Sequence, residues 1–444
     1  MKVAIVGGGI SGLGAAWELM QHGHEVTVFE QEERLGGKLQ TTTIDRVQVE
    51  LGPDSYLRRN PSANELLDHL VLSEIAPATS KALLYTSTGT EPIPAGLNLG
   101  TPLRAQQAIA NHLVPPSARL RAAIGALVPS LWPSGFSDDL GAIVANRYGR
   151  RWADANVEPL VGGINANTIY GLSAQTSAPS ILHAPPPAPS SGAATTPAFG
   201  APSGGLSVLI DQLQDALLAG GCTIVTSAPV QSIERRGPSD VLITTPAVSY
   251  PSQRLLLALP AYQSASLLGP LFGDGRSLLS AIHYSSVSML ISYSKEALPS
   301  RLLEVSGILV ARNLGLLTTA VSIASNKWPG WTAQAGTLLR ISTGSLYDRR
   351  HLRMEDTELL EALTLEVNQM LAHQLPTAWN RIVRWNRSFP HFRPYHAQLV
   401  AKLDADLFDR FHGDIGVTGA YINGSGIPTC IATARSRAQQ LVSA

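Results

Sequence analysis

The residues best suited to chemistry stand at the start of the chain, where a glycine-rich turn joins two apolar segments. Residues 2–6 read as a short buried strand, and Gly7-Gly8-Gly9-Ile10-Ser11-Gly12 follows directly. After a helix-like stretch, a second apolar segment, 25–29, ends on Glu30. The order strand, G-x-G-x-x-G, helix, strand, acid is the one that a dinucleotide-binding βαβ unit requires. We therefore expect this turn to bind a dinucleotide.

Each residue of the turn has a physical task in such a site. Gly7 allows the tight turn, Gly9 lets a pyrophosphate approach the backbone, and Gly12 lets the helix pack close to the strand. The amides at the helix N-terminus point at the phosphates, and Glu30 can accept hydrogen bonds from a ribose hydroxyl. A lone G-x-G-x-x-G can be merely a turn, but the flanking strand, helix and acid favour binding.

Two downstream patches favour FAD over a nicotinamide cofactor. Gly36-Gly37 is followed by Lys38, which suits a loop that passes close over the diphosphate and the ribityl chain, with the lysine as charge partner. Gly52-Pro53-Asp54-Ser55 is a tight turn able to bring backbone amides to a flavin ring. The alternative for the first patch is an exposed turn with a solvated lysine.

Length and composition bound the class of protein. The 444 residues can form two or three domains, and the 33 basic and 33 acidic residues balance, which argues against nucleic acid as a partner. Cys222 and Cys430 are far apart and outside any metal-ligand spacing, so we expect no metal site, no disulfide framework and a cytoplasmic location. We expect no signal peptide and no transmembrane segment.

The elements that must position these residues indicate an α/β protein with a Rossmann-like FAD-binding domain, a mixed-sheet substrate domain and a helical subdomain. Periodicity predicts helices in much of 61–183 and over 355–371, a strand over 229–233, and strands within 281–345, for example 286–291 and 337–341. The Pro/Ala-rich stretch 184–204 reads as a flexible loop. The predicted boundaries are 1–60, 201–275 and 383–444 for the FAD-binding domain, 61–183 for the helical subdomain, and 276–382 for the substrate-binding domain.

Six sequence blocks resemble the flavin amine oxidase superfamily, in particular the soluble Gram-positive-type protoporphyrinogen/coproporphyrinogen oxidases of heme synthesis. The resemblance covers nearly the whole chain, and it implies an amine oxidase-like fold. Blocks 6–13 and 34–38 are shared by many flavoproteins, and block 52–57 carries Tyr56 where the family typically has an aromatic residue. Blocks 157–164 (V-E-P-L-V-G-G-I), 384–390 with His396, and 418–431 separate this family from the amine oxidases and the carotenoid desaturases.

The resemblance implies FAD as the cofactor and assigns its contacts. Val230 would pair backbone groups with the adenine edge, and Trp385 would pack near the flavin unless it is simply a core residue. We expect non-covalent binding, because Cys430 follows a proline at a helix start and lies in no attachment motif. The expected contacts are Gly7, Gly8, Gly9, Ile10, Ser11, Gly12, Glu30, Gly37, Lys38, Gly52, Pro53, Asp54, Ser55, Val230, Trp385, Ser425, Gly426 and Ile427.

The chain departs from the family pattern at four positions that bear on substrate contacts. Thr429 and Asn423 stand where an acid is usual, and Tyr395 replaces the glycine before His396. Asn60 falls where some members carry a lysine near the substrate. These departures leave the FAD assignment intact.

The implied reaction is oxidation of a porphyrinogen to a porphyrin in three two-electron steps, with hydride transfer to the flavin, O2 as acceptor and H2O2 as product. Coproporphyrinogen III is favoured, because its four carboxylates suit a chain without an evident membrane element. Protoporphyrinogen IX, an amine oxidase or desaturase activity, and a flavin-fold protein without turnover remain open. We assign no catalytic acid or base.

Anionic propionates call for arginines at the pocket mouth, and Arg58, Arg59 and Arg147 are the candidates. An exposed arginine is more often a solvated charge. The resemblance leaves open a weak peripheral membrane contact, handover of product to a ferrochelatase, and the oligomeric state.

Overall fold

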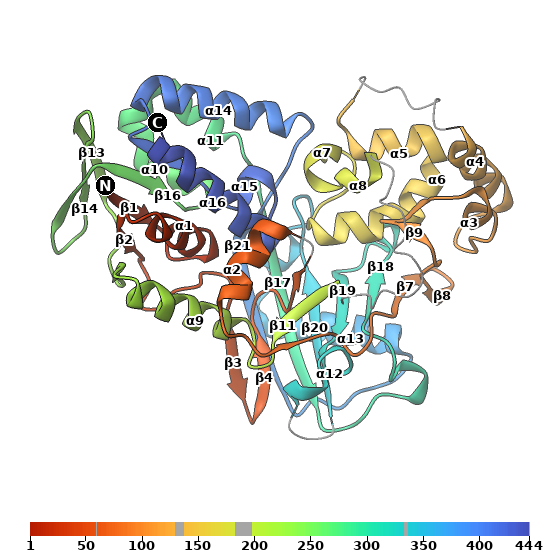
Figure 1. The fold of residues 1–444 in the computed structure, drawn as a ribbon. Coiled ribbons are helices and arrows are strands. Elements are labelled where there is room, and N and C mark those ends of the chain that lie inside the picture. Colours follow the sequence, from red (N-terminus) through yellow and green to blue (C-terminus); the bar gives the residue numbers. More distant parts are fainter. Residues whose placement is uncertain (59, 129–136, 183–197, 333–335, 444) are drawn as a thin grey trace. The chain divides into compact units, whose positions relative to one another are not determined.

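The computed structural model describes residues 1–58, 60–128, 137–182, 198–332 and 336–443. The chain forms two compact units. Unit 1 comprises Met1–Ala76, Thr196–His283 and Ala397–Ala444, and unit 2 comprises Pro77–Thr195 and Tyr284–His396. Figure 1 shows the elements of both units.

A parallel five-stranded sheet forms the centre of unit 1. Its order is β12-β2-β1-β16-β22, and each neighbouring pair is parallel. The four residues of β1 after Lys2 are all buried, as expected for a strand covered on both faces. The strands are β1 Lys2–Val6, β2 Glu25–Phe29, β12 Thr223–Val225, β16 Arg254–Leu257 and β22 Ile415–Val417. This is the predicted Rossmann-like arrangement.

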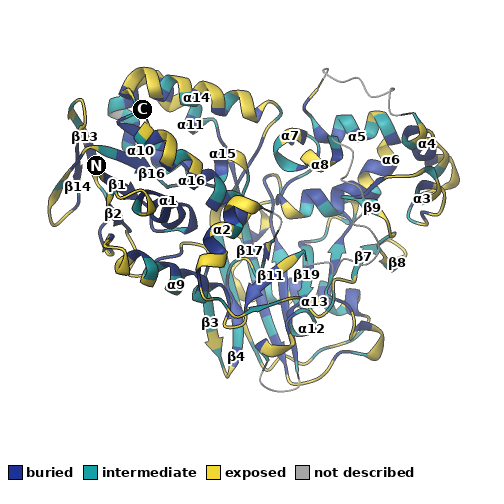
Figure 2. Ribbon diagram, viewed as in Figure 1, coloured by how far each residue is buried: buried dark blue, intermediate teal, exposed yellow. Residues whose placement is uncertain are grey.

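Three helices supply most of the core around that sheet: α1 Ile10–Gln21, α9 Leu206–Ala219 and α16 Ile427–Ser443. Helix α1 is buried along nearly its whole length, as Figure 2 shows by its colour. Helix α1 packs against α16 at Gly14, where a Cβ would make an ordinary van der Waals contact of 3.6 Å with Cα of Ile431.

Smaller elements complete unit 1. Strands β3 Thr41–Ile44 and β4 Val47–Glu50 form a hairpin, and β13 Ser232–Gly237, β14 Asp240–Thr244 and β15 Ser249–Ser252 form an antiparallel sheet. A three-stranded sheet has the order β5-β11-β6, with β5 Tyr56–Leu57, β6 Glu74–Ile75 and β11 Phe199–Pro202. The helices are α2 Pro61–His69, α10 Ala261–Phe272, α11 Arg276–Ser280, α14 His396–Phe411 and α15 Ala420–Asn423.

Unit 2 contains a mixed seven-stranded sheet of order β21-β17-β20-β19-β18-β7-β8. Its strands β18 and β7 pair in parallel, and its other neighbours are antiparallel. Helix α13, Asp356–Leu371, buries its apolar face in the same core cluster as this sheet. The strands are β7 Ala82–Thr86, β8 Gly89–Pro92, β17 Tyr284–Ser294, β18 Gly307–Val310, β19 Thr318–Ile323, β20 Thr337–Thr343 and β21 Trp379–Pro390.

The helical part of unit 2 has its own core, centred on the buried Trp152, Leu140 and Val157. It includes a π-helix, η2, Ala153–Gly162, with Pro159 inside it. A proline has no amide hydrogen to donate, which favours a departure from α-helical bonding. The other helices are α3 Ala105–Ile109, α4 Pro116–Leu127, α5 Leu140–Tyr148, α6 Arg150–Trp152, α7 Ala174–Ser177 and α8 Pro179–Leu182.

The structure corrects three boundaries drawn from the sequence. Residues 383–396 belong to unit 2, because β21 pairs along β17 from Tyr284–Pro390 to Tyr293–Trp379. Residues 61–76 and 276–283 belong to unit 1. Within the predicted loop 184–204, residues 198–204 are described and include β11, which pairs with β5 and β6; residues 184–197 lie outside the described residues.

Candidate cofactor site

The glycine-rich turn has the shape that a nucleotide cofactor requires. Gly7 has φ 108°, a conformation that favours glycine, and a Cβ at Gly12 would lie 1.9 Å from the carbonyl oxygen of Gly7. A Cβ at Gly9 would meet no protein atom within 4 Å. The chain therefore packs tightly beneath the turn and leaves open space above Gly9, where the sequence places the pyrophosphate.

The N-terminus of α1 faces this space without a protein cap. No capping side chain and no acidic first-turn residue is present among the described residues. The first amides of a helix have no intrahelical acceptor and attract anions. Ser11 and Gly12 therefore supply donors where phosphate oxygens would lie.

Glu30 is held at the end of β2 by two backbone amides. Its Oε2 accepts from Gly8 N at 2.7 Å, and its Oε1 accepts from Glu32 N at 3.1 Å. Glu30 is 9% exposed. The carboxylate is thus fixed beside the turn, with lone pairs left for a ribose hydroxyl.

The segment that contains Val230 lies beside Glu30 rather than in a strand. Ala228 N donates to Glu30 O at 2.8 Å, and Ser227 N donates to Glu32 O at 2.9 Å. The strand expected over 229–233 is wrong, because β13 begins at Ser232. Val230 therefore lies in the connection between β12 and β13, two residues beyond the Ala228–Glu30 contact.

The second glycine pair packs against the turn. Gly36 N donates to Gly8 O at 2.8 Å, and a Cβ at Gly37 would lie 3.5 Å from Cα of Gly9. Gly36 and Gly37 have φ of 97° and 56°. This geometry fits a loop that covers a diphosphate.

Arg34 shapes that loop, a role that sequence reasoning missed. Its Nη1 donates to Leu35 O at 2.9 Å, and its Nη2 donates to Gly37 O at 2.5 Å. The arginine was part of a recognised block, but nothing in its spacing distinguished a contact with its own loop from a contact with a ligand.

Lys38, Cys430 and Ser11 lie together at the start of α16. Loss of solvation lowers the pKa of Lys38, although much of its side chain remains solvent-accessible. Burial raises the pKa of the Cys430 thiol to about 11, while a hydrogen bond with Ser11 and the charge of Lys38 oppose that rise. Ser425, Gly426 and Ile427 form the entry to α16 in the same unit, and its first turn carries no acidic residue among those described.

The turn Gly52–Ser55 packs against the same lysine. A Cβ at Gly52 would lie 2.0 Å from Lys38 O. No other residue can therefore occupy position 52 unless the backbone moves. Ser55 Oγ donates to Asp54 Oδ1 at 2.8 Å. Unit 1 contains all the expected cofactor residues except Trp385, which lies in β21 of unit 2.

Two of the three candidate substrate arginines, Arg58 and Arg147, are engaged within the protein. Arg58 forms ion pairs with Glu74 and Asp68, and Tyr56 donates its hydroxyl to the same Glu74. Arg147 Nε donates to Gly125 O at 2.9 Å. Arg59 lies outside the described residues. A substrate role for these arginines stays a prediction.

The four departures from the family pattern have local roles. Asn60 caps α2 by accepting from Ala63 N at 3.4 Å, and Asn423 Nδ2 donates to Thr433 Oγ1 at 3.3 Å. Thr429 packs near Gly424. Tyr395 adopts φ 65°, the left-handed region where the family's glycine would be unstrained.

Comparisons with known proteins identify the family of the chain. The family model described as flavin containing amine oxidoreductase matches residues 10–442. A coproporphyrinogen III oxidase of Mycobacterium leprae is 29% identical over 97% of this chain and 96% of its own length, and one of Bacillus subtilis is 26% identical over 97% and 95%. A chloroplastic protoporphyrinogen oxidase of Spinacia oleracea is 25% identical over 100% of this chain and 84% of its own length.

The fold also matches solved structures. A protein of Exiguobacterium sp. 255-15, provisionally described as a protoporphyrinogen oxidase, has a TM-score of 0.87 at 24% identity, covering 100% of this chain and 99% of that one. A cyclohexylamine oxidase of Brevibacterium oxydans has a TM-score of 0.73 at 15% identity, covering 100% and 98%. The chain belongs to the flavin-containing amine oxidoreductase family, and it has the flavoenzyme fold of that family.

Proposed function

We propose that the protein is an FAD-dependent oxidase that converts a porphyrinogen to a porphyrin, with coproporphyrinogen III as the preferred substrate. The observation that carries the substrate assignment is the match, over 97% of the chain, to relatives named coproporphyrinogen III oxidase. The balanced reaction is coproporphyrinogen III plus three O2 to coproporphyrin III plus three H2O2. Protoporphyrinogen IX is the second candidate substrate, supported by the chloroplastic relative.

The residues of unit 1 support FAD as the flavin. Glu30 offers an acceptor for a ribose hydroxyl, the α1 amides offer donors for the diphosphate, and Lys38 offers a cation beside α16. Bound FAD would supply the two-electron chemistry. The chain's own contribution is to bind and orient that group, which the Gly9 opening and the Gly36-Gly37 loop allow.

We infer that the flavin is held without a covalent bond. Cys430 is buried, and its raised pKa keeps the sulfur as a thiol at neutral pH. Its Sγ donates to Gly424 O at 3.6 Å. Acid precipitation should leave the yellow colour in the supernatant, and colour in the pellet would contradict this inference.

We also propose a protein without a membrane span that works in the cytoplasm. None of the helices in the described ranges is long and apolar enough to cross a bilayer.

The decisive experiment is a side-by-side assay of the flavin-loaded protein on coproporphyrinogen III and protoporphyrinogen IX. Porphyrin fluorescence and peroxide should rise together, faster with coproporphyrinogen III, and both should stop without O2. Turnover without O2 when NAD is added would contradict the assignment of the acceptor. No turnover of either porphyrinogen, with flavin reduction by a primary amine, would favour an amine oxidase instead.

A further inference from the structure

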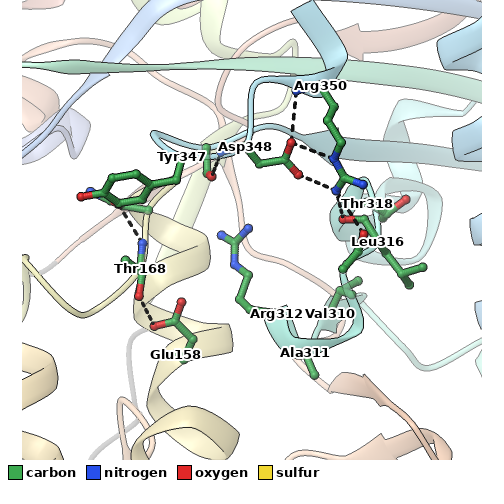
Figure 3. Close-up of a pocket in the computed structure, with 13 residues that line it drawn as sticks. Glu158, Thr168, Val310, Ala311, Arg312, Leu316, Thr318, Tyr347, Asp348 and Arg350 are labelled. Carbon is green, nitrogen blue, oxygen red and sulfur yellow. Dashed lines mark hydrogen bonds and ion pairs between the residues drawn. The ribbon is translucent and has the colours of Figure 1, made fainter. Parts of the chain in front are cut away.

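A pocket of about 360 Å³ lies within unit 2. Its lining residues are far along the chain from the glycine-rich turn. Its lining comes from η2, from the residues after it, from the β18–β19 connection and from the segment 345–350 (Figure 3). The volume is at the lower end of the range for small-molecule sites. No motif of the sequence analysis pointed to it.

The two cations of this pocket differ in how far the protein satisfies them. Arg350 donates to both oxygens of Asp348, from Nε at 3.0 Å and from Nη2 at 2.6 Å, and Nη2 also donates to Gly315 O and Leu316 O, both at 3.1 Å. Arg312 makes one long hydrogen bond within the described residues, from Nη2 to Gly162 O at 3.4 Å. Arg312 therefore retains most of its donors.

Figure 3 shows the Arg312 guanidinium pointing into the space between Glu158 and Asp348. Glu158 already accepts from Ile169 N at 2.7 Å and from Thr168 Oγ1 at 3.1 Å. Burial raises the pKa of Glu158, which favours its neutral form, and the hydrogen bonds and Arg312 oppose this. Asp348 is already paired with Arg350. Neither carboxyl group is thus a dedicated partner of Arg312.

Two further donors of the pocket lining have no protein acceptor in the described part of the chain: Asn167 Nδ2 and Thr318 Oγ1. Asn167 and Thr318 are each 2% exposed. Buried polar atoms are nearly always hydrogen-bonded in native proteins. A cation with one long hydrogen bond and two buried donors without any acceptor together call for an acceptor from outside the chain.

We propose that this pocket binds a carboxylate of an organic ligand, with Arg312 as its charge partner and Asn167 and Thr318 as neutral donors. A carboxylate offers about four lone-pair sites, enough for all three groups. Tyr347, which also lines the pocket, is 70% exposed, so the pocket reaches solvent. If the proposed function is right, on which this assignment rests, the carboxylate is a propionate of the tetrapyrrole. A small dicarboxylic acid would offer the same chemical group.

The test uses the flavin-loaded protein and three probes: coproporphyrin III, its tetramethyl ester, and succinate. Binding is measured by fluorescence for the porphyrins and by calorimetry for succinate. Arg312→Met should weaken coproporphyrin III binding about ten- to hundred-fold, Arg312→Lys should restore part of it, and the ester should bind with no dependence on residue 312. Arg381→Met, which removes an exposed arginine of β21 in the same unit, should change nothing.

Asn167→Ala provides a second variant that keeps the charge of Arg312. It should weaken the same probe by a smaller factor while flavin content and melting temperature stay near wild type. Lower melting temperatures for Arg312→Met and Asn167→Ala with unchanged binding of every probe would overturn the proposal, because Arg312 would then act only as a bridge between Glu158 and Asp348.

In a third outcome, succinate binding depends on Arg312 but coproporphyrin III binding does not. The pocket would then be a carboxylate site whose ligand is not the tetrapyrrole. This outcome also separates the two proposals. A protein that oxidises no porphyrinogen could still bind succinate at Arg312, whereas a competent oxidase with unaltered binding in both variants would refute the pocket alone.

Discussion

The main-chain amide of Gly8 donates a 2.7 Å hydrogen bond to Oε2 of Glu30, joining the turn after β1 to the end of β2. Glu30 therefore has two tasks. It fixes the shape of the turn, and it presents the lone pairs that would receive a ribose. We therefore expect a substitution of Glu30 to weaken cofactor binding in two ways, by loosening the turn and by removing the acceptor for the ribose.

Glu30→Ala should weaken flavin binding about ten- to hundred-fold, or roughly 1.5–3 kcal/mol, because it removes a charged acceptor and leaves the Gly8 and Glu32 amides without theirs. The measurement is titration of the flavin-free protein with FAD by fluorescence quenching. Glu33→Gln, at an exposed neighbour, is the control. Equal affinity in all three proteins would show that Glu30 is not part of the site.

Gly9→Val should give a folded but colourless protein, because a side chain at residue 9 meets no protein atom yet occupies the place of the pyrophosphate. Gly12→Val should instead impair folding, since its Cβ would collide with Gly7 O. Absorbance at 450 nm and the melting temperature of the flavin-free forms distinguish the two. If Gly9→Val bound FAD normally, the diphosphate would lie elsewhere.

Arg435→Met should destabilise unit 1 by about 3–5 kcal/mol, the usual effect of breaking a buried ion pair. Arg435 and Glu18 are paired at 10% and 2% side-chain exposure, and Arg435 also contacts Glu65 and the Trp17 ring. Arg437→Met breaks the more exposed pair with Asp404 and should cost less. Urea unfolding measures both, and an equal cost would refute the role assigned to burial.

Tyr395→Gly should raise stability by a few tenths to about 1 kcal/mol. The substitution removes a left-handed strain of about 1–2 kcal/mol, part of which is offset by the greater freedom of glycine in the unfolded chain. Tyr395 is 52% exposed, so little packing is lost. Tyr395→Ala keeps the strained φ and should show no such gain in the same unfolding experiment.

Stability should fall as the pH decreases below about 6.5, and His351 should contribute to that fall. Burial lowers the pKa of His351 from 6.5 in the folded protein; a hydrogen bond with the Ser286 backbone opposes this shift, and Arg384 adds to it. The unfolded chain therefore binds the extra proton first, which decreases the free energy of unfolding by up to about 1.4 kcal/mol per pH unit between the two pKa values. Urea titrations at pH 5 to 8 should show a shallower dependence for His351→Gln.

The parts of the fold that the sequence predicted well are those set by neighbouring residues. The opening βαβ unit, helix α13 over 356–371 and the strands around 286–291 and 337–341 follow from periodicity within one segment. Strand β11 was missed because its partners β5 and β6 lie more than 120 positions earlier. Trp385 was assigned to the wrong unit for the same reason, since only its pairing with Val287 shows which sheet it joins.

The site divides in the same way. Gly7 to Gly12 and Glu30 form a local motif with a known physical logic, so their positions could be expected. Arg312, Asn167 and Thr318 come from three separate segments and have no distinctive spacing. Their common pocket appears only when the chain has folded.

The order of strands in unit 1 has a consequence for the newly made chain. The glycine-rich turn is synthesised some 250 residues before β16, which pairs with β1, and β22 and α16 follow later still. In a nascent chain, the turn is thus exposed long before the parallel sheet of unit 1 is complete and before α16 has been synthesised. We therefore expect the flavin to bind late in folding, because Cys430 of α16 lies beside Ser11 and Lys38 of the turn region. A shortened chain that lacks α16 should fail to retain it.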